Sequence, residues 1–153
     1  MLYTVRKVFK FEAAHILDAA YSKCCTACIH GHSYTVEVFI QRQATNPANN
    51  MVIDFGLLSN ALRPTFAYYD HSLILPPHLH DIYSSQCQDL GLDPNKLILF
   101  PENPTAEAMA RIFFGLAEEA LKHVITDPMV SIRSVRVHET DTGFAEYTEN
   151  QHE

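Results

Sequence analysis

The sequence predicts an α+β fold in which two helices cover one face of a four-stranded antiparallel sheet. Segments that alternate apolar and polar residues form one pair near the start of the chain and a second pair near its end, at 3–14 with 32–41 and at 129–140 with 144–148. Two stretches with helical periodicity lie between these pairs, at 54–69 and 104–124. Two hairpins that flank a helical pair favour an antiparallel sheet over a parallel one.

The first hairpin is predicted to present three histidines on its core side. In the first strand, His15 continues the parity of the apolar residues Val5, Phe9, Phe11 and Ala13. In the second strand, His30 and His32 extend the parity of Tyr34, Val36, Val38 and Ile40. Because residues two apart on a strand point to the same face, all three imidazoles are expected on the side that packs the core.

The two helices have recognisable start signals. Asp54 is the expected N-cap of the first helix, which Pro64 is expected to kink or shorten. Asn103 is the expected N-cap of the second helix, with Pro104 in its first position. Both helices repeat apolar residues on one stripe, so each is expected to pack one side against the sheet.

The segment from 71 to 100 separates the two helices. It contains Pro76-Pro77 and Gly91, which interrupt regular structure. We therefore expect a long irregular connection with a helical turn near 82–90. Loops of this length are often functional.

Length and composition limit the possible functions. The 153 residues fit a single domain, predicted to span 1–153, and 47% hydrophobic with 19% charged residues is an ordinary globular composition. No segment has the ~18 consecutive apolar residues of a membrane helix, and the first residues lack a signal-peptide pattern, so we expect no membrane partner and a cytoplasmic location. A net charge of −7 argues against nucleic acid as a partner.

The sharpest local signal is the motif His30-Gly31-His32. Two imidazoles on the same side of a strand can reach one ion, and His15 at the end of the neighbouring strand supplies a third ligand. Three protein ligands leave zinc an open position, which is the catalytic arrangement. The alternative without a metal is a set of surface histidines.

The cysteines offer two further interpretations of the same segment. Cys25 and Cys28 form a C-x-x-C motif that runs into His30-Gly31-His32, so a structural zinc site built from this one stretch is possible. Such sites usually draw ligand pairs from separate elements, which disfavours it. A thioredoxin-like redox role is weaker, because that motif accompanies a βαβ pattern that this chain lacks.

Three acidic side chains and one more histidine are candidates for chemistry. Asp70-His71 could be an exposed pair at a helix end or a proton shuttle. Glu139 shares its parity with Val135 and Val137, so it faces inward and needs a partner, either an arginine or a ligand with two adjacent N–H donors. Glu107 lies in the first turn of the second helix, where the helix dipole alone explains an acid.

Six motifs follow one another along the chain: Phe11-Glu12-Ala13-Ala14-His15, His30-Gly31-His32, Met51-Val52-Ile53-Asp54-Phe55, Asp70-His71, Asn103-Pro104-Thr105-Ala106-Glu107 and His138-Glu139-Thr140. In these motifs the chain resembles the 6-pyruvoyltetrahydropterin synthase and 6-carboxytetrahydropterin synthase family. The resemblance implies the tunnelling fold (T-fold), in which ββααββ subunits close into trimeric barrels that pair as hexamers, with sites at subunit interfaces. It also implies zinc on His15, His30 and His32.

The resemblance further implies a lyase acting on a pterin. In the bacterial branch, 7,8-dihydroneopterin triphosphate becomes 6-carboxy-5,6,7,8-tetrahydropterin with loss of acetaldehyde and triphosphate, a step toward queuosine; the animal branch makes 6-pyruvoyltetrahydropterin. By this carry-over Glu139 anchors the pterin ring, and Thr105 and Glu107 are further candidates for substrate binding. His71, oriented by Asp70, would tune a cysteine thiolate that moves protons.

The chain departs from the family pattern at the thiol and in length. The bacterial cysteine position, four residues before His30, holds Thr26, and the animal position, six before, holds Cys24. Cys25 lies between them and is our first choice of thiol, with Cys24 second. The stretch 75–101 is longer than the bacterial link, which could alter substrate choice. Lys23 is the candidate for the residue that contacts the phosphates.

Two other functions stay open on sequence. One is a paralogue that cleaves the side chain of another reduced pterin, as an aldolase would. The other is a protein without catalytic activity whose cysteine and histidine cluster holds structural zinc.

Overall fold

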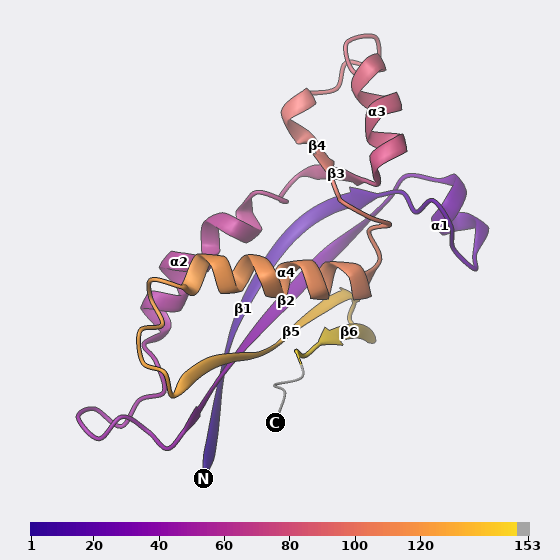
Figure 1. Ribbon diagram of the computed structural model, residues 1–153. Coiled ribbons are helices and arrows are strands. Elements are labelled where there is room, and N and C mark those ends of the chain that lie inside the picture. The colour runs from indigo at the N-terminus through magenta and orange to yellow at the C-terminus, as the bar shows by residue number, and fades with distance from the viewer. Residues whose placement is uncertain (150–153) are drawn as a thin grey trace.

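The computed structural model describes residues 1–149, except the side chains of Cys24 and Ala27. It contains one six-stranded sheet with the strand order β4-β3-β1-β2-β5-β6 (Figure 1). The strands are β1 (Leu2–His15), β2 (His30–Gln43), β3 (Ser72–Leu75), β4 (Leu97–Leu99), β5 (Val130–Thr140) and β6 (Gly143–Tyr147). The α-helices are α1 (Lys23–Ala27), α2 (Phe55–Ala67), α3 (Pro77–Gln86) and α4 (Ala106–Leu121), and Pro94–Lys96 forms a 3₁₀ turn.

The two predicted hairpins are confirmed. β1 pairs with β2 antiparallel along its full length, with His15 opposite His30 and Ala13 opposite His32. β2 continues the sheet by pairing with β5, and β5 pairs with β6, both antiparallel. The four strands that the alternation of apolar residues predicted therefore lie side by side in the order β1-β2-β5-β6.

The prediction of a purely antiparallel, four-stranded sheet is wrong, because the segment 71–100 adds two strands. β3 pairs with the end of β1 in parallel, and β4 pairs with β3 in parallel. The prolines and the glycine of this segment lie between these strands rather than within them, and Pro77 begins α3. The predicted helical turn near 82–90 is thus a helix that starts five residues earlier. β3 lies beside the last residues of β1, and α3 and β4 extend outward from that end of the sheet (Figure 1).

The start of α2 is as predicted, and the start of α4 is not. The Asp54 carboxylate accepts hydrogen bonds from the amides of Gly56 and Leu57, and α2 continues through Pro64 to Ala67. At α4 the N-cap is Thr105, whose hydroxyl accepts from the Ala108 amide. Asn103 cannot cap this helix, because its side chain is bonded to the loop after β1.

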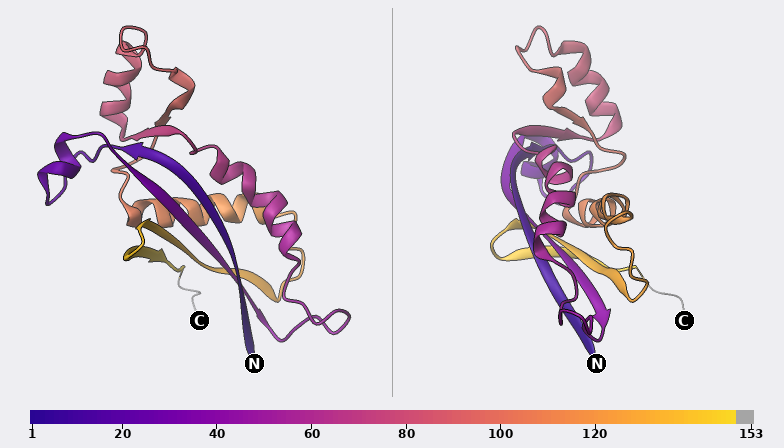
Figure 2. Two further views of the ribbon diagram at one scale, coloured as in Figure 1. Left: turned by 180° about the vertical axis from the view of Figure 1, so that it is seen from behind. Right: turned by 90° about the vertical axis from the view of Figure 1, so that its left-hand side faces the viewer.

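The core lies between the sheet and the helices α2 and α4, which share one face as predicted (Figure 2). Phe113 of α4 is fully buried and contacts the rings of Phe11, Phe66 and Tyr69. Burial of such a ring stabilises the fold by roughly 1.5–3 kcal/mol. A smaller cluster, Ile16, Leu75 and Leu97, attaches β3 and β4 to the end of β1. None of the helices within 1–149 has the length and apolarity needed to cross a bilayer.

The opposite face of the sheet is polar, and its centre is Glu37 on β2. The Glu37 side chain is buried, and its carboxylate accepts hydrogen bonds from Arg6 on β1 and from His138 and Arg136 on β5. Burial alone would raise the pKa of Glu37, but these bonds and the two arginine charges outweigh it and lower the pKa. The network thus joins three strands on the side away from the helices.

Candidate functional site

Three histidines meet at the end of the first hairpin. His15 ends β1, and His30 and His32 begin β2, so the strand pairing brings their side chains to one place on the core face. One ring nitrogen from each lies within 4.8 Å of the other two, and the ring centroids are 4.5 to 5.2 Å apart. The predicted convergence of the three imidazoles is therefore present in the structure.

Backbone carbonyls orient two of the rings. His15 Nδ1 lies 2.9 Å from the Pro104 carbonyl oxygen, and His30 Nδ1 lies 3.2 Å from the Cys28 carbonyl oxygen. A carbonyl can only accept, so each Nδ1 donates its proton to it, and in the neutral form of each ring the lone pair is then on Nε2. The two Nε2 atoms face each other at 2.9 Å. Lone pairs so placed repel unless a cation lies beside them.

The third ring and the protonation state agree with a metal site. His32 Nε2 is buried without a hydrogen-bond partner, although buried polar atoms normally have one. Burial, together with the neighbouring histidines, lowers the pKa of His15 to about 4 despite its bond to Pro104, and burial also lowers the pKa of His32. Both rings are therefore neutral at pH 7, as metal ligands must be. Three imidazole nitrogens fit zinc with one position left for a substrate.

The structural-zinc alternative requires Cys25 and Cys28 to join this cluster, and they do not. Within the described residues, the only group able to hold a metal with three or more such side chains is His15, His30 and His32. Cys28 contacts His30 through its backbone carbonyl oxygen, which accepts a hydrogen bond from His30 Nδ1. Cys25, in α1, accepts a hydrogen bond from the Ser22 hydroxyl at 2.9 Å. The side chain of Cys24, the second choice of thiol, lies outside the described part of the chain.

A cavity of about 310 Å³ lies next to the histidines and contains the predicted pterin-binding residues Thr105, Glu107 and Glu139. A Glu139 carboxylate oxygen is 4.0 Å from His15 Nε2, so the cavity and the metal cluster adjoin. Burial raises the pKa of Glu139, the Glu107 charge raises it further, and His30 opposes both. The volume is at the small end of the range for ligand pockets.

Two of these residues also have local structural roles. Thr105 uses its hydroxyl to cap α4, and Glu107 stands in the first turn, where its charge is stabilised by the helix dipole. Sequence reasoning missed Leu17 and Phe144, which also line the cavity. It also missed the Pro104 carbonyl as the partner of His15, because every residue has a backbone carbonyl and the sequence does not show which one accepts a given hydrogen bond.

Asp70 and His71 form the predicted pair, with His71 Nδ1 2.8 Å from the Asp70 carboxylate. Asp70 also accepts from the Glu12 amide, and the His71 side chain is 76% exposed. His71 lies beside Glu12, whereas the Cys25 carbonyl is bonded to the amide of Leu17, five residues further along. The strand part of this stretch, from Glu12 to His15, already spans roughly 10 Å. The pair and Cys25 of one chain are therefore apart.

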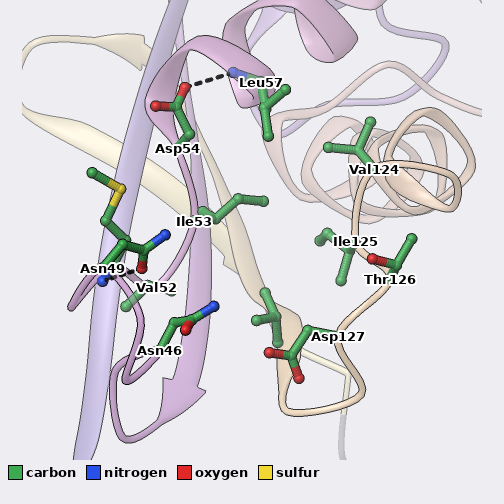
Figure 3. A pocket seen from close by; sticks show the side chains of 12 residues that line it. Asn46, Asn49, Val52, Ile53, Asp54, Leu57, Val124, Ile125, Thr126 and Asp127 are labelled. Carbon is green, nitrogen blue, oxygen red and sulfur yellow. Dashed lines mark hydrogen bonds between the residues drawn. The ribbon is translucent and has the colours of Figure 1, made fainter.

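A second cavity, of about 210 Å³, lies at the other end of β2 between the loop 46–54 and the segment 124–130 (Figure 3). Its polar side chains are used locally. Asn46 and Asn49 accept from backbone amides of their own loop, Asp54 caps α2, and Asp127 pairs with Arg42. The chemistry that the histidines permit lies elsewhere, so we assign no reaction to this cavity.

Comparisons with known proteins bear on the site. The sequence profile of the family described as 6-pyruvoyl tetrahydropterin synthase matches residues 4–150. A 6-carboxy-5,6,7,8-tetrahydropterin synthase of Helicobacter pylori (strain J99) is 32% identical over 148 residues, which cover 93% of this chain and 70% of that protein. One from Haemophilus influenzae is 32% identical over 158 residues, which cover 97% of this chain and all of that protein. The crystal structure of a Plasmodium vivax 6-pyruvoyltetrahydropterin synthase mutant matches with a TM-score of 0.73 at 20% identity, covering 98% of this chain and 99% of that one. The likeness confirms the expected tunnelling fold.

Proposed function

The chain belongs to the 6-pyruvoyl tetrahydropterin synthase family, and from that premise we propose that it is a zinc-dependent pterin lyase of the 6-carboxytetrahydropterin synthase type. Its substrate would be 7,8-dihydroneopterin triphosphate and its products 6-carboxy-5,6,7,8-tetrahydropterin, acetaldehyde and triphosphate, a step toward queuosine. The observation that carries the proposal is the cluster of three imidazoles beside a cavity lined by the half-buried Glu139 carboxylate. The names of the relatives, which cover nearly the whole chain, support the same reaction.

Each residue has a part in this chemistry. His15, His30 and His32 would hold zinc, which when bound polarises side-chain hydroxyls of the substrate. Glu139 would accept two N–H groups of the pterin ring, and it can do so only as the carboxylate. Thr105 and Glu107 would border the ring. The Cys25 thiol would carry protons to and from the substrate side chain.

The proposal includes a homo-oligomer, a hexamer built from trimers, in the cytoplasm. The Asp70–His71 pair supports it, because it is exposed and distant from Cys25 within one chain. In an oligomer the pair would serve the thiol of a neighbouring subunit, with His71 as the proton acceptor. Lys23 on α1 is exposed and would meet the triphosphate.

The decisive experiment is incubation of the zinc-loaded protein with 7,8-dihydroneopterin triphosphate and assay of acetaldehyde. Acetaldehyde should be released, Cys25→Ala should stop its release while zinc stays bound, and Cys28→Ala should remain active. If Cys25→Ala retains full activity, Cys25 is not the thiol, and Cys24 is the next variant to test. A product that retains all three side-chain carbons would mean that the reaction is that of a 6-pyruvoyltetrahydropterin synthase.

A second candidate is a paralogue that cleaves another reduced pterin. Two observations favour it: Thr26 occupies the bacterial cysteine position, and the long segment after β3 forms a helix and a further strand beside the histidine end of the sheet. Comparing turnover of 7,8-dihydroneopterin with and without its triphosphate separates the two. Faster turnover of the dephosphorylated compound would favour the paralogue.

A further inference from the structure

We propose that Asn103 is a positioning residue. It would fix the cysteine-bearing loop, residues 16–29, to the end of the sheet where His15, His30 and His32 meet. The inference rests on the proposed function, since it takes Cys25 as the reacting thiol. Asn103 precedes α4 and is only partly buried, so its side chain is not needed to fill the core. Its contacts, however, reach across the site.

Both ends of the Asn103 amide bind the backbone of the loop that follows β1. Its Oδ1 accepts from the Asp18 amide at 2.8 Å, and its Nδ2 donates to the Ala19 carbonyl at 2.9 Å. These partners are 85 and 84 positions away in the sequence. A two-point bond of this kind needs one acceptor and one donor at fixed spacing, which asparagine provides and aspartate does not.

The bonded backbone lies next to the contact that closes the cysteine loop. Leu17 precedes Asp18, and its amide donates to the Cys25 carbonyl at 3.1 Å. Leu17 is buried, whereas Asp18 and Ala19 are exposed. The two bonds from Asn103 therefore hold the backbone next to Leu17, and through the Leu17 bond they help to position Cys25.

The residues after Asn103 fix the other parts of the site. The Pro104 carbonyl orients His15, and Thr105 caps α4 and lines the cavity. Asn103, Pro104 and Thr105 thus contact the cysteine-bearing loop, His15 and the cavity, in that order. Asp18 has a second tether, since its carboxylate pairs with His78 of α3, but that bond holds an exposed side chain and not the backbone.

The experiment measures alkylation of Cys25 by iodoacetamide in the zinc-loaded full chain, resolved by tandem mass spectrometry. Alkylation of Cys87, the C-cap of α3, which packs against the cluster of Ile16, Leu75 and Leu97, is the internal reference. Asn103→Ala loses two hydrogen bonds, so the cysteine-bearing loop should open more often. The ratio of the Cys25 alkylation rate to the Cys87 alkylation rate should therefore be about tenfold larger than in the wild type. Asn103→Asp keeps one bond and should fall between. Asn95→Ala, which removes a local side-chain hydrogen bond to Asp93 in the exposed 3₁₀ turn, is the matched control.

Turnover supplies the second readout. With a misplaced thiol, kcat of Asn103→Ala should fall about tenfold while KM changes less than about twofold and zinc content stays at the wild-type level. An unchanged alkylation ratio with unchanged kcat would overturn the proposal, and so would a loss of zinc equal to the loss of activity. If the wild type itself releases no acetaldehyde, the proposed function fails, and the alkylation ratio still decides whether Asn103 holds the loop.

Discussion

The histidine cluster makes a quantitative prediction about zinc and stability. A ligand that binds only the folded chain stabilises it by RT ln(1 + [L]/Kd), which is about 2.7 kcal/mol when zinc is present at 100 times its Kd. For a domain of this size each kcal/mol corresponds to roughly 2–4 °C in Tm. Adding zinc to the metal-free protein should therefore raise Tm by about 5–10 °C.

His15→Ala should remove nearly all of this effect. The substitution deletes one of three nitrogen ligands, and even loss of an outer-shell partner weakens metal binding by about 10–100-fold. At a 100-fold weaker affinity the same zinc concentration equals Kd, so the stabilisation falls to about 0.4 kcal/mol and the Tm shift to about 1 °C.

The assay is differential scanning fluorimetry with and without zinc, together with zinc content by mass spectrometry. His138→Ala is the matched control, because His138 bonds Glu37 on the opposite face. Cys28→Ala should also keep the full shift. The reasoning is refuted if His15→Ala still binds one zinc per chain with the wild-type shift, or if Cys28→Ala loses the metal, since the ligands would then be those of a structural cysteine site.

Three further predictions follow from the described contacts. Glu107→Gln should move the acid limb of the pH profile of kcat/KM to lower pH. Glu139 must be ionised to bind the pterin, and loss of the Glu107 charge removes one cause of the raised pKa of Glu139. An unchanged acid limb would mean that the ionisation of Glu139 does not govern that limb. Glu37→Gln should reduce the loss of folding stability on acidification. The pKa of Glu37 is lowered in the folded state, so its contribution to stability is present above the unfolded-state pKa and is lost as pH falls through the folded-state pKa. Urea unfolding at pH 7 and pH 4 measures this loss. Phe113→Ala should destabilise the fold by about 3–5 kcal/mol with zinc stoichiometry retained, and a cost below ~1 kcal/mol in urea unfolding would contradict the described core.

Sequence periodicity predicted the part of the fold that depends on local alternation. His15, His30 and His32 could be assigned to one face because a strand has a period of two and the flanking apolar residues mark the buried side. Asp54 was predicted correctly as a cap because its partners are the next amides in the chain. These features need no knowledge of distant contacts.

The features that were missed depend on distant partners. β3 and β4 have four and three residues, which is too few for alternation to show. They form because β3 pairs with the edge of β1 and β4 pairs with β3. Asn103 looked like a cap, but partners more than eighty residues earlier take its side chain. The separation of His71 from Cys25 likewise follows from the pairing of β3 with β1, which the sequence does not display.

The pairing of β1 with β2 has a consequence for how the protein can be monitored. The strand positions that bury Phe11, Tyr34 and Val36 are continued by the three imidazoles, so core and ligands obey a single alignment. A slip of one residue would turn the ligands of one strand toward the opposite face while its partner's stayed in place. Metal binding therefore depends on the correct register of β1 and β2. Metal uptake during refolding should show when the two strands have paired in that register.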